Sequence, residues 1–268
     1  MTLKNRLFSS AWQPLTPRGV AAFSRASLPQ VLLVQLVVAL FAAAAVVWFL
    51  SHGWFPVVRE AIQQLPAEGE IRRGEFVWRG DSPKRLSANS FLSFSVDLWR
   101  DGTPSREAHM AVEFGRKDVR IHSLFGYAEV QYPAVMIEFN RPGLQPWWGA
   151  WEPWLLAAAA VATVAGLMAS WWLLGTAYSV VAWLAALYSN RELSWGAGWK
   201  LAAAALMPGA LMMTLGIIAY GLGFIDLIRL ALVFGIHWLP GWIYLFVSPF
   251  FLPRDPTAAK QKRNPFAG

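Results

Sequence analysis

Four long apolar runs constrain this chain more than any other feature of its sequence. A helix of about 20 apolar residues crosses the roughly 30 Å hydrocarbon core of a bilayer. A soluble protein could not hide this much apolar surface from water. We therefore predict an α-helical membrane bundle with four transmembrane helices. The runs cover residues 31–50, 154–174, 201–220 and 228–252.

Composition excludes the other broad classes of protein. Hydrophobic residues make up 56% of the chain and charged residues 15%, whereas soluble domains carry roughly 25% charged residues. Disordered chains are poor in apolar residues and rich in charge, so disorder is excluded as well. The chain contains 0 cysteines, which excludes disulfides, thiolate metal sites and a cysteine nucleophile.

The distribution of basic residues predicts the orientation of the four spans. The first thirty residues carry Lys4, Arg6, Arg18 and Arg25 and no acidic residue, and the tail beginning at Arg254 is also basic. Residues 51–150 are neutral overall, although they are rich in charged side chains. Because basic flanks stay on the cytoplasmic side, we expect both termini inside and residues 51–150 outside, in a bacterial cytoplasmic membrane.

The predicted order of segments follows from these spans. Residues 1–30 are a cytoplasmic segment with an amphipathic face made by Leu3, Leu7, Phe8, Ala11 and Trp12, which favours contact with anionic lipid. Residues 31–50 are an uncleaved signal anchor, because their apolar core is longer than that of a signal peptide. The remaining segments are 51–150 outside, 151–252 with spans two to four, an inner loop at about 176–198, and a basic cytoplasmic tail at 253–268.

The apolar pattern also continues past the expected end of span two, through Val180 and Leu184 to Tyr188. A fifth span here would place the basic tail outside, against the charge rule. The remaining interpretations are one long helix that overshoots the membrane, or a helix on the inner surface.

Residues 51–150 have the pattern of a small β-rich domain. Short runs of alternating apolar and polar residues between 71 and 139 predict five or six strands in a small antiparallel sheet or barrel. Asp101-Gly102 and the segment from Gly115 to Asp118 are the predicted hairpin turns. This insert is therefore an extracytoplasmic domain between the first two spans.

No pattern of an enzyme or a metal site is present in the sequence. It lacks His-Glu-x-x-His, Gly-x-Ser-x-Gly and a phosphate-binding loop. His109 and His122 could meet acidic residues on the sheet, but their spacing favours ordinary solvated strand positions. We therefore expect a protein that is not an enzyme and has no catalytic residue, metal or cofactor.

Polar residues inside membrane spans are the better candidates for a functional site, because they are costly when unpaired. Asp226 and Arg229 lie three residues apart at the outer start of span four, and His237 lies deeper, before Pro240-Gly241. An interfacial ion pair and a kinked helix explain them structurally. The functional alternative is a transport path for a small solute or lipid between kinked spans three and four.

Small residues recur at helical spacing on two spans. Such faces let helix backbones approach closely. They pack either within the bundle, which we favour, or against a second copy in a homo-oligomer. The residues are Ala158, Ala162, Gly166 and Ser170 on span two, and Ala205 and Gly209 on span three.

Three stretches resemble the YvdJ-like family of bacterial multi-pass membrane proteins, which is associated with maltodextrin utilisation. The resemblance rests on residues 3–10 with Pro17 and Phe23, on residues 65–76 with 94–97, and on residues 193–195 and 199–202 with Met207-Pro208. The resemblance covers nearly the whole chain and brings no catalytic residues. It implies an accessory membrane protein near envelope transport.

Together these observations predict an accessory or sensory partner of an envelope or transport system. The expected partners are the lipid bilayer and a transporter or envelope protein, with no nucleic acid. A small-solute or lipid transporter is the alternative, and an intramembrane hydrolase is disfavoured because Ser170, Thr214 and Ser248 have no evident basic partner.

Overall fold

The computed structural model describes residues 13–100 and 108–254. Its contacts divide the chain into two compact units. The helical unit comprises Met1–Ala45, Ala160–Ile217 and Leu230–Gly268, and the strand unit comprises Val46–Ala159 and Ile218–Arg229. The predicted amphipathic face at residues 3–12 and most of the basic tail lie outside the described residues.

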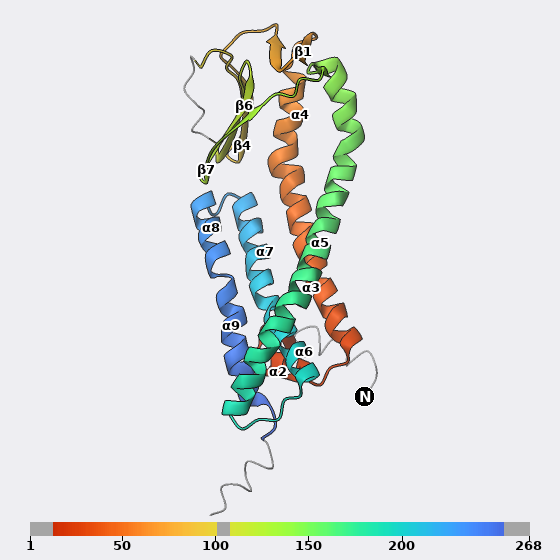
Figure 1. Ribbon diagram of the computed structural model, residues 1–268, viewed down its shortest axis with the longest axis vertical. Coiled ribbons are helices and arrows are strands. Elements are labelled where there is room, and N and C mark those ends of the chain that lie inside the picture. The colour runs from red at the N-terminus through yellow and green to blue at the C-terminus, as the bar shows by residue number, and fades with distance from the viewer. Residues whose placement is uncertain (1–12, 101–107, 255–268) are drawn as a thin grey trace, which may run out of the picture. The chain divides into compact units, whose positions relative to one another are not determined.

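Within the described part of the chain, four helical segments are long and apolar enough to cross a membrane (Figure 1). This confirms the predicted number. The first contains α3 (Leu28–Phe49), the π-helical turn η2 (Leu50–Trp54) and α4 (Phe55–Gln63). The second is α5 (Arg141–Tyr188), the third contains α6 (Trp195–Ala205) and α7 (Met207–Gly221), and the fourth contains α8 (Leu227–Ile236), α9 (Trp238–Val247) and η3 (Ser248–Phe251).

The third and fourth segments are interrupted where the sequence predicted kinks. Leu206 separates α6 from α7 just before Pro208, and His237 separates α8 from α9 just before Pro240. A proline inside a helix lacks the N–H that would bond to the carbonyl four residues earlier. Gly209 lies so close to the carbonyl oxygen of His237 that a Cβ atom there would collide with it.

Span two is a single continuous helix of 48 residues. It extends through the region where the sequence left a long helix and a surface helix as alternatives. The connection between α5 and α6 is therefore shorter than the expected loop of about 176–198, because the helix continues to Tyr188. Its apolar stripe packs into the helical unit through Trp171, Ala182 and Ala186.

The helical unit also contains a short helix that the sequence did not predict. The turn η1 (Gln13–Leu15) is followed by α2 (Pro17–Phe23), which Thr16 caps by accepting a hydrogen bond of 3.1 Å from the Gly19 amide. Val20 and Phe23 of α2 are fully buried against α6 and its neighbours. Residues before span one are thus part of the core.

The strand unit holds eight described strands in two sheets. One sheet has the order β2-β1-β8 and the other β3-β4-β5-β6-β7. The expected small antiparallel sheet of five or six strands is confirmed in part: the described strands are more numerous and form two sheets, and all pairs are antiparallel except β4 with β5, which run parallel. The bounds are β1 (Gly69–Arg72), β2 (Glu75–Trp78), β3 (Lys84–Ala88), β4 (Leu92–Val96), β5 (Met110–Phe114), β6 (Asp118–Ser123), β7 (Gly126–Gln131) and β8 (Ile137–Glu138).

The two predicted hairpin turns have different outcomes. Asp101-Gly102 lies outside the described residues. The predicted turn from Gly115 to Asp118 is confirmed. It joins the antiparallel strands β5 and β6, and the amide of Gly115 donates a hydrogen bond of 2.8 Å to the carbonyl of Asp118. The core under the sheets contains Ile71, Phe76 and Val96 and is covered by α4.

Candidate functional site

An aromatic contact joins one end of the five-stranded sheet to the last turn of α7, within the strand unit. Nδ1 of His109 lies 2.8 Å from the hydroxyl oxygen of Tyr220, and their rings stack with centroids 5.4 Å apart. Phe91 meets the Tyr220 ring edge-on at 4.9 Å, and Phe49 lies 5.3 Å from it. Tyr220 is buried in this cluster. We call these four residues the coupling cluster.

The parallel pairing of β4 with β5 creates this cluster. Leu92 and Met110 are register partners at the start of the two strands. The preceding residues, Phe91 and His109, therefore lie at the same end of the sheet. There the Met110 amide donates a hydrogen bond of 3.1 Å to the Phe91 carbonyl. Antiparallel strands would have placed these two rings at opposite ends.

A second connection runs from the same sheet end to the π-helical turn η2. The side-chain amide of Asn89 donates a hydrogen bond of 2.6 Å to the carbonyl of Gly53. Its side-chain oxygen accepts bonds of 2.9 Å from the amides of Phe91 and Leu92. A π-helical turn widens the helix locally and shifts its hydrogen bonding. The sheet is thus held to both helical segments that enter the strand unit at this end, α3 through η2 and α7 through Tyr220.

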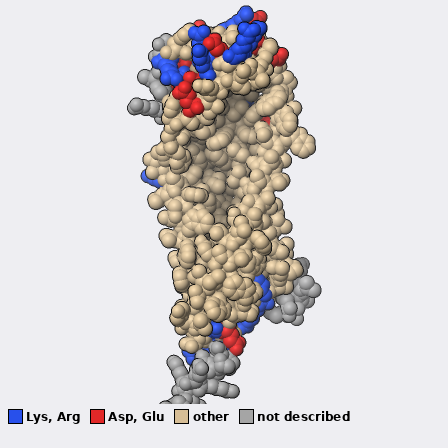
Figure 2. All heavy atoms as spheres, in the orientation of Figure 1, with Lys and Arg blue, Asp and Glu red and all other residues tan. Residues whose placement is uncertain are grey.

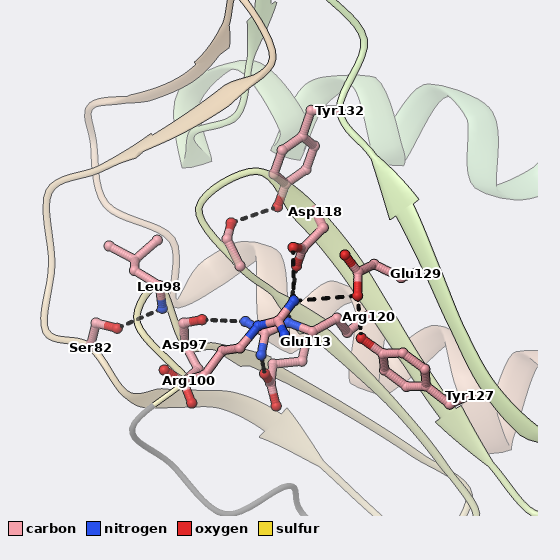
Figure 3. Close-up of polar contacts among 11 residues, drawn as sticks. Ser82, Asp97, Leu98, Arg100, Glu113, Asp118, Arg120, Tyr127, Glu129 and Tyr132 are labelled. Atoms are coloured by element: carbon pink, nitrogen blue, oxygen red, sulfur yellow. Dashed lines mark hydrogen bonds and ion pairs between the residues drawn. The ribbon is translucent and has the colours of Figure 1, made fainter.

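A buried ionic cluster stiffens the middle of the sheet (Figure 3). Arg120 and Glu113 are each 7% exposed and form an ion pair of 2.6 Å across β6 and β5. Nε of Arg120 lies 3.0 Å from the carboxylate of Asp118, and its terminal nitrogen donates to the carbonyl of Asp97. A side chain at Gly115 would collide with this arginine. The guanidinium is surrounded by protein acceptors, which points to a structural role.

An exposed rim of charged groups continues from this cluster. The guanidinium of Arg100 lies 3.4 Å from the carboxylate of Asp118 and 3.3 Å from that of Glu129. The hydroxyl of Tyr127 donates a hydrogen bond of 2.6 Å to Glu129. The hydrogen bond from Tyr127, helped by the charge of Arg100, lowers the pKa of Glu129. The same bond raises the pKa of Tyr127. Burial raises the pKa of Tyr132, whose hydroxyl donates a hydrogen bond of 3.1 Å to the Gly115 carbonyl.

Two open pockets with polar linings lie on the strand unit. One, of about 520 Å³, is bordered by Glu60, Ser87 and Asn89. The hydroxyl of Ser87 donates a hydrogen bond of 2.7 Å to the Glu60 carboxylate. The other, about 490 Å³, is bordered by residues of β1, β2 and β8 and by the start of α5, and its lining includes the register partners Glu70 and Glu138. The first pocket shares Asn89 with the sheet's connection to η2.

The polar side chains predicted in span four make hydrogen bonds and ring contacts with residues close to them in the sequence. The carboxylate of Asp226 accepts a 2.8 Å hydrogen bond from the Arg229 amide, so it caps the start of α8, and their exposed side chains lie 3.9 Å apart. Nδ1 of His237 forms a hydrogen bond with the carbonyl of Phe234, and its ring lies tilted against that of Trp238, with centroids 4.6 Å apart. Each partner is within three residues in sequence, so these contacts have a structural explanation.

The small-residue faces behave differently on the two spans. Ala205 and Gly209 of span three are buried, and Gly209 meets the backbone at His237. The four small residues of span two are all exposed, and a Cβ atom at Gly166 would meet nothing within 4 Å. Helix α5 instead packs through another stripe that contains Val164, Leu167 and Met168.

Metal binding finds no support in residues 13–100 and 108–254, where no group of three or more His, Asp or Glu side chains could hold an ion. His109 is used in the coupling cluster, and His122 packs on Tyr127 with ring centroids 4.9 Å apart. Sequence reasoning considered both histidines but missed Tyr220 and Phe91. The available signal was an aromatic residue at the end of span three and another at the start of a strand.

Comparison with known proteins yields no relative. No family model matches the chain, and neither a curated protein nor a solved structure is similar to it.

Proposed function

We propose that the protein is a multi-pass membrane protein without chemistry of its own, which acts as an accessory or sensory partner of an envelope or transport system. In this proposal the strand domain lies outside a bacterial cytoplasmic membrane and both termini lie inside. The resemblance to YvdJ-like proteins favours the same role.

The observation that carries the proposal is the coupling cluster. His109 and Phe91 belong to the sheet, whereas Tyr220 and Phe49 belong to helices α7 and α3. A change in the sheet would therefore act on two helices at one point. The pocket of about 520 Å³ beside Asn89 offers a place where a small polar solute or a segment of a partner could exert that change.

The helices themselves favour a role in signalling or assembly over transport. No Asp, Glu, Lys or Arg occurs in α3, α7 or α9, whereas ion and proton pathways need chains of ionisable groups. On the face shown in Figure 2, charged side chains gather over the strands and, in the helical unit, at one end, and the rest of the helices' surface carries almost none.

Affinity purification from a mild detergent, with quantitative mass spectrometry, tests this function. The wild-type chain should recover a membrane or envelope protein in near-stoichiometric amounts. Tyr220→Phe should reduce that recovery, and Tyr188→Phe, at an exposed position, should not. Recovery of the chain alone in repeated purifications would contradict the proposal.

A further inference from the structure

The hairpin between β6 and β7 exposes two large apolar side chains at its tip. Leu124 is 51% exposed and Phe125 is 80% exposed. The turn is well formed, since the Phe125 amide donates 3.2 Å to the Ser123 hydroxyl and Gly126 has a φ of 127°. Turns of this kind usually carry Gly, Asn, Asp or Ser, which water solvates well. Two apolar residues here need an explanation other than turn geometry.

Strand register places this tip at the same end of the sheet as the coupling cluster. Ser123 pairs with Met110 across β6 and β5. The residue before Met110 is His109, which bonds to Tyr220 one residue before the end of α7. Adjacent strands lie about 4.8 Å apart, so the tip lies beside the end of a helix that is apolar enough to cross a membrane.

Other exposed groups of the strand unit have the same character. The turn after α7 exposes Leu222 and Phe224. Figure 1 shows the β6–β7 turn at the end of the strand domain that faces this α7–α8 turn. Leu and Phe side chains are among those that interfacial segments bury at the boundary between lipid headgroups and acyl chains.

The hairpin also becomes uncharged toward its tip. Residues 121–128 contain no Asp, Glu, Lys or Arg, and the first charged residues beyond them are Arg120 and Glu129. Those two belong to the ionic groups further up the sheet. A neutral apolar tip below a charged body is the arrangement expected of a loop that dips into a lipid interface.

We propose that Leu124 and Phe125 insert into the outer leaflet of the lipid bilayer, so that the hairpin anchors the strand domain on lipid beside α7. This inference rests on the proposed placement of the four helical segments in a membrane. The anchor would keep the sheet at a fixed height while the coupling cluster contacts α7.

The absence of cysteine from the sequence makes site-directed spin labelling direct. Nitroxides are placed at Phe125→Cys and, separately, at Leu124→Cys in liposomes, and their collision rates with oxygen and with a water-soluble nickel chelate are compared. The matched control is Met136→Cys, a 65% exposed apolar position next to β8. The lipid standard is Leu232→Cys, 63% exposed on α8.

The inference predicts an oxygen-to-nickel collision ratio at both hairpin positions near that of Leu232 and several-fold above that of Met136. A ratio equal to that of Met136, or low collision rates with both reagents, would overturn it, because the tip would then lie in water or under protein. If the Leu232 label itself reports water, the membrane placement fails instead, so the two failures are distinguishable.

A second variant avoids dependence on the label. Leu124→Ser combined with Phe125→Ser should speed amide hydrogen exchange in β6 and β7 several-fold in liposomes. Val135→Ser combined with Met136→Ser, also at exposed positions, should leave those strands unchanged. Equal exchange in the wild type and the hairpin variant would count against lipid anchoring.

Discussion

His109 and Tyr220 share a hydrogen bond of 2.8 Å, although 111 positions separate them in the sequence. This bond joins the residue before β5 to the last turn of α7, and the aromatic rings of Phe91 and Phe49 surround it. One sheet end is thereby attached to two helices. We expect these contacts to stabilise this end of the sheet.

Tyr220→Phe keeps the ring stack and removes only the hydroxyl. Because a net hydrogen bond contributes about 1 kcal/mol, amides near the cluster should exchange about fivefold faster. Hydrogen exchange of residues 90–92 and 109–110 in the detergent-solubilised protein measures this effect. Tyr188→Phe is the control, and equal exchange in the Tyr220 variant and the wild type would show that the bond does not hold the sheet end.

Arg120→Met should destabilise the strand domain strongly. It leaves the buried carboxylate of Glu113 without its cation, whereas Asp118 keeps its pair with Arg100. Breaking a buried pair costs about 3–5 kcal/mol. The control is Arg79→Met, whose exposed pair with Glu68 should contribute about 1 kcal/mol or less. Denaturant unfolding of the full chain in detergent compares them, and similar losses in both variants would contradict a structural role for the buried cluster.

Acid stability should depend on the bond from Tyr127 to Glu129. The folded-state pKa of Glu129 is lowered from its ordinary value of 4.5. The stability this carboxylate adds is therefore complete above that pH and is lost as pH falls through the lower folded pKa. Tyr127→Phe should raise the folded pKa and flatten the decline in thermal stability below pH 4.5. Parallel stability curves for wild type and variant between neutral and acid pH would refute this link.

Two glycines give opposite expectations for the same substitution. Gly209→Ala places a methyl group against the carbonyl of His237, so overpacking should cost about 1–3 kcal/mol. Gly166→Ala meets nothing within 4 Å and should cause no loss of stability. Unfolding in mixed micelles compares the variants. If Gly166→Ala instead weakens self-association at unchanged monomer stability, the exposed small-residue face of α5 contacts a second copy.

The features that sequence predicted are those with local physical causes. Helix length follows from the apolar runs, and the breaks before Pro208 and Pro240 follow from a missing N–H and a ring clash. The turn from Gly115 to Asp118 is likewise encoded by adjacent residues. None of these features requires knowledge of distant contacts.

The features that sequence did not predict depend on contacts between distant segments. Parallel pairing of β4 with β5 has no signature in the sequence of either strand. This pairing alone places Phe91 and His109 at the same end of the sheet. Tyr220 is simply the last residue of an apolar run in the sequence, and only its contacts with His109 and Phe91 distinguish it. Helix α2 is too short to show a periodic pattern, and its burial depends on α6. The side chains of the residues chosen from the sequence, Asp226, Arg229 and His237, contact residues close to them in the chain, and their part in transport stays a prediction.

The most direct test of the account is the sidedness of two engineered cysteines in an otherwise cysteine-free chain. Met136→Cys lies in the strand domain, and Tyr188→Cys lies at the end of α5; both positions are exposed. In sealed, right-side-out vesicles, a membrane-impermeant maleimide should label Met136→Cys at once and Tyr188→Cys only after permeabilisation. Labelling of both cysteines from the outside, or of Tyr188→Cys alone, would contradict a strand domain outside the membrane joined by α5 to the interior.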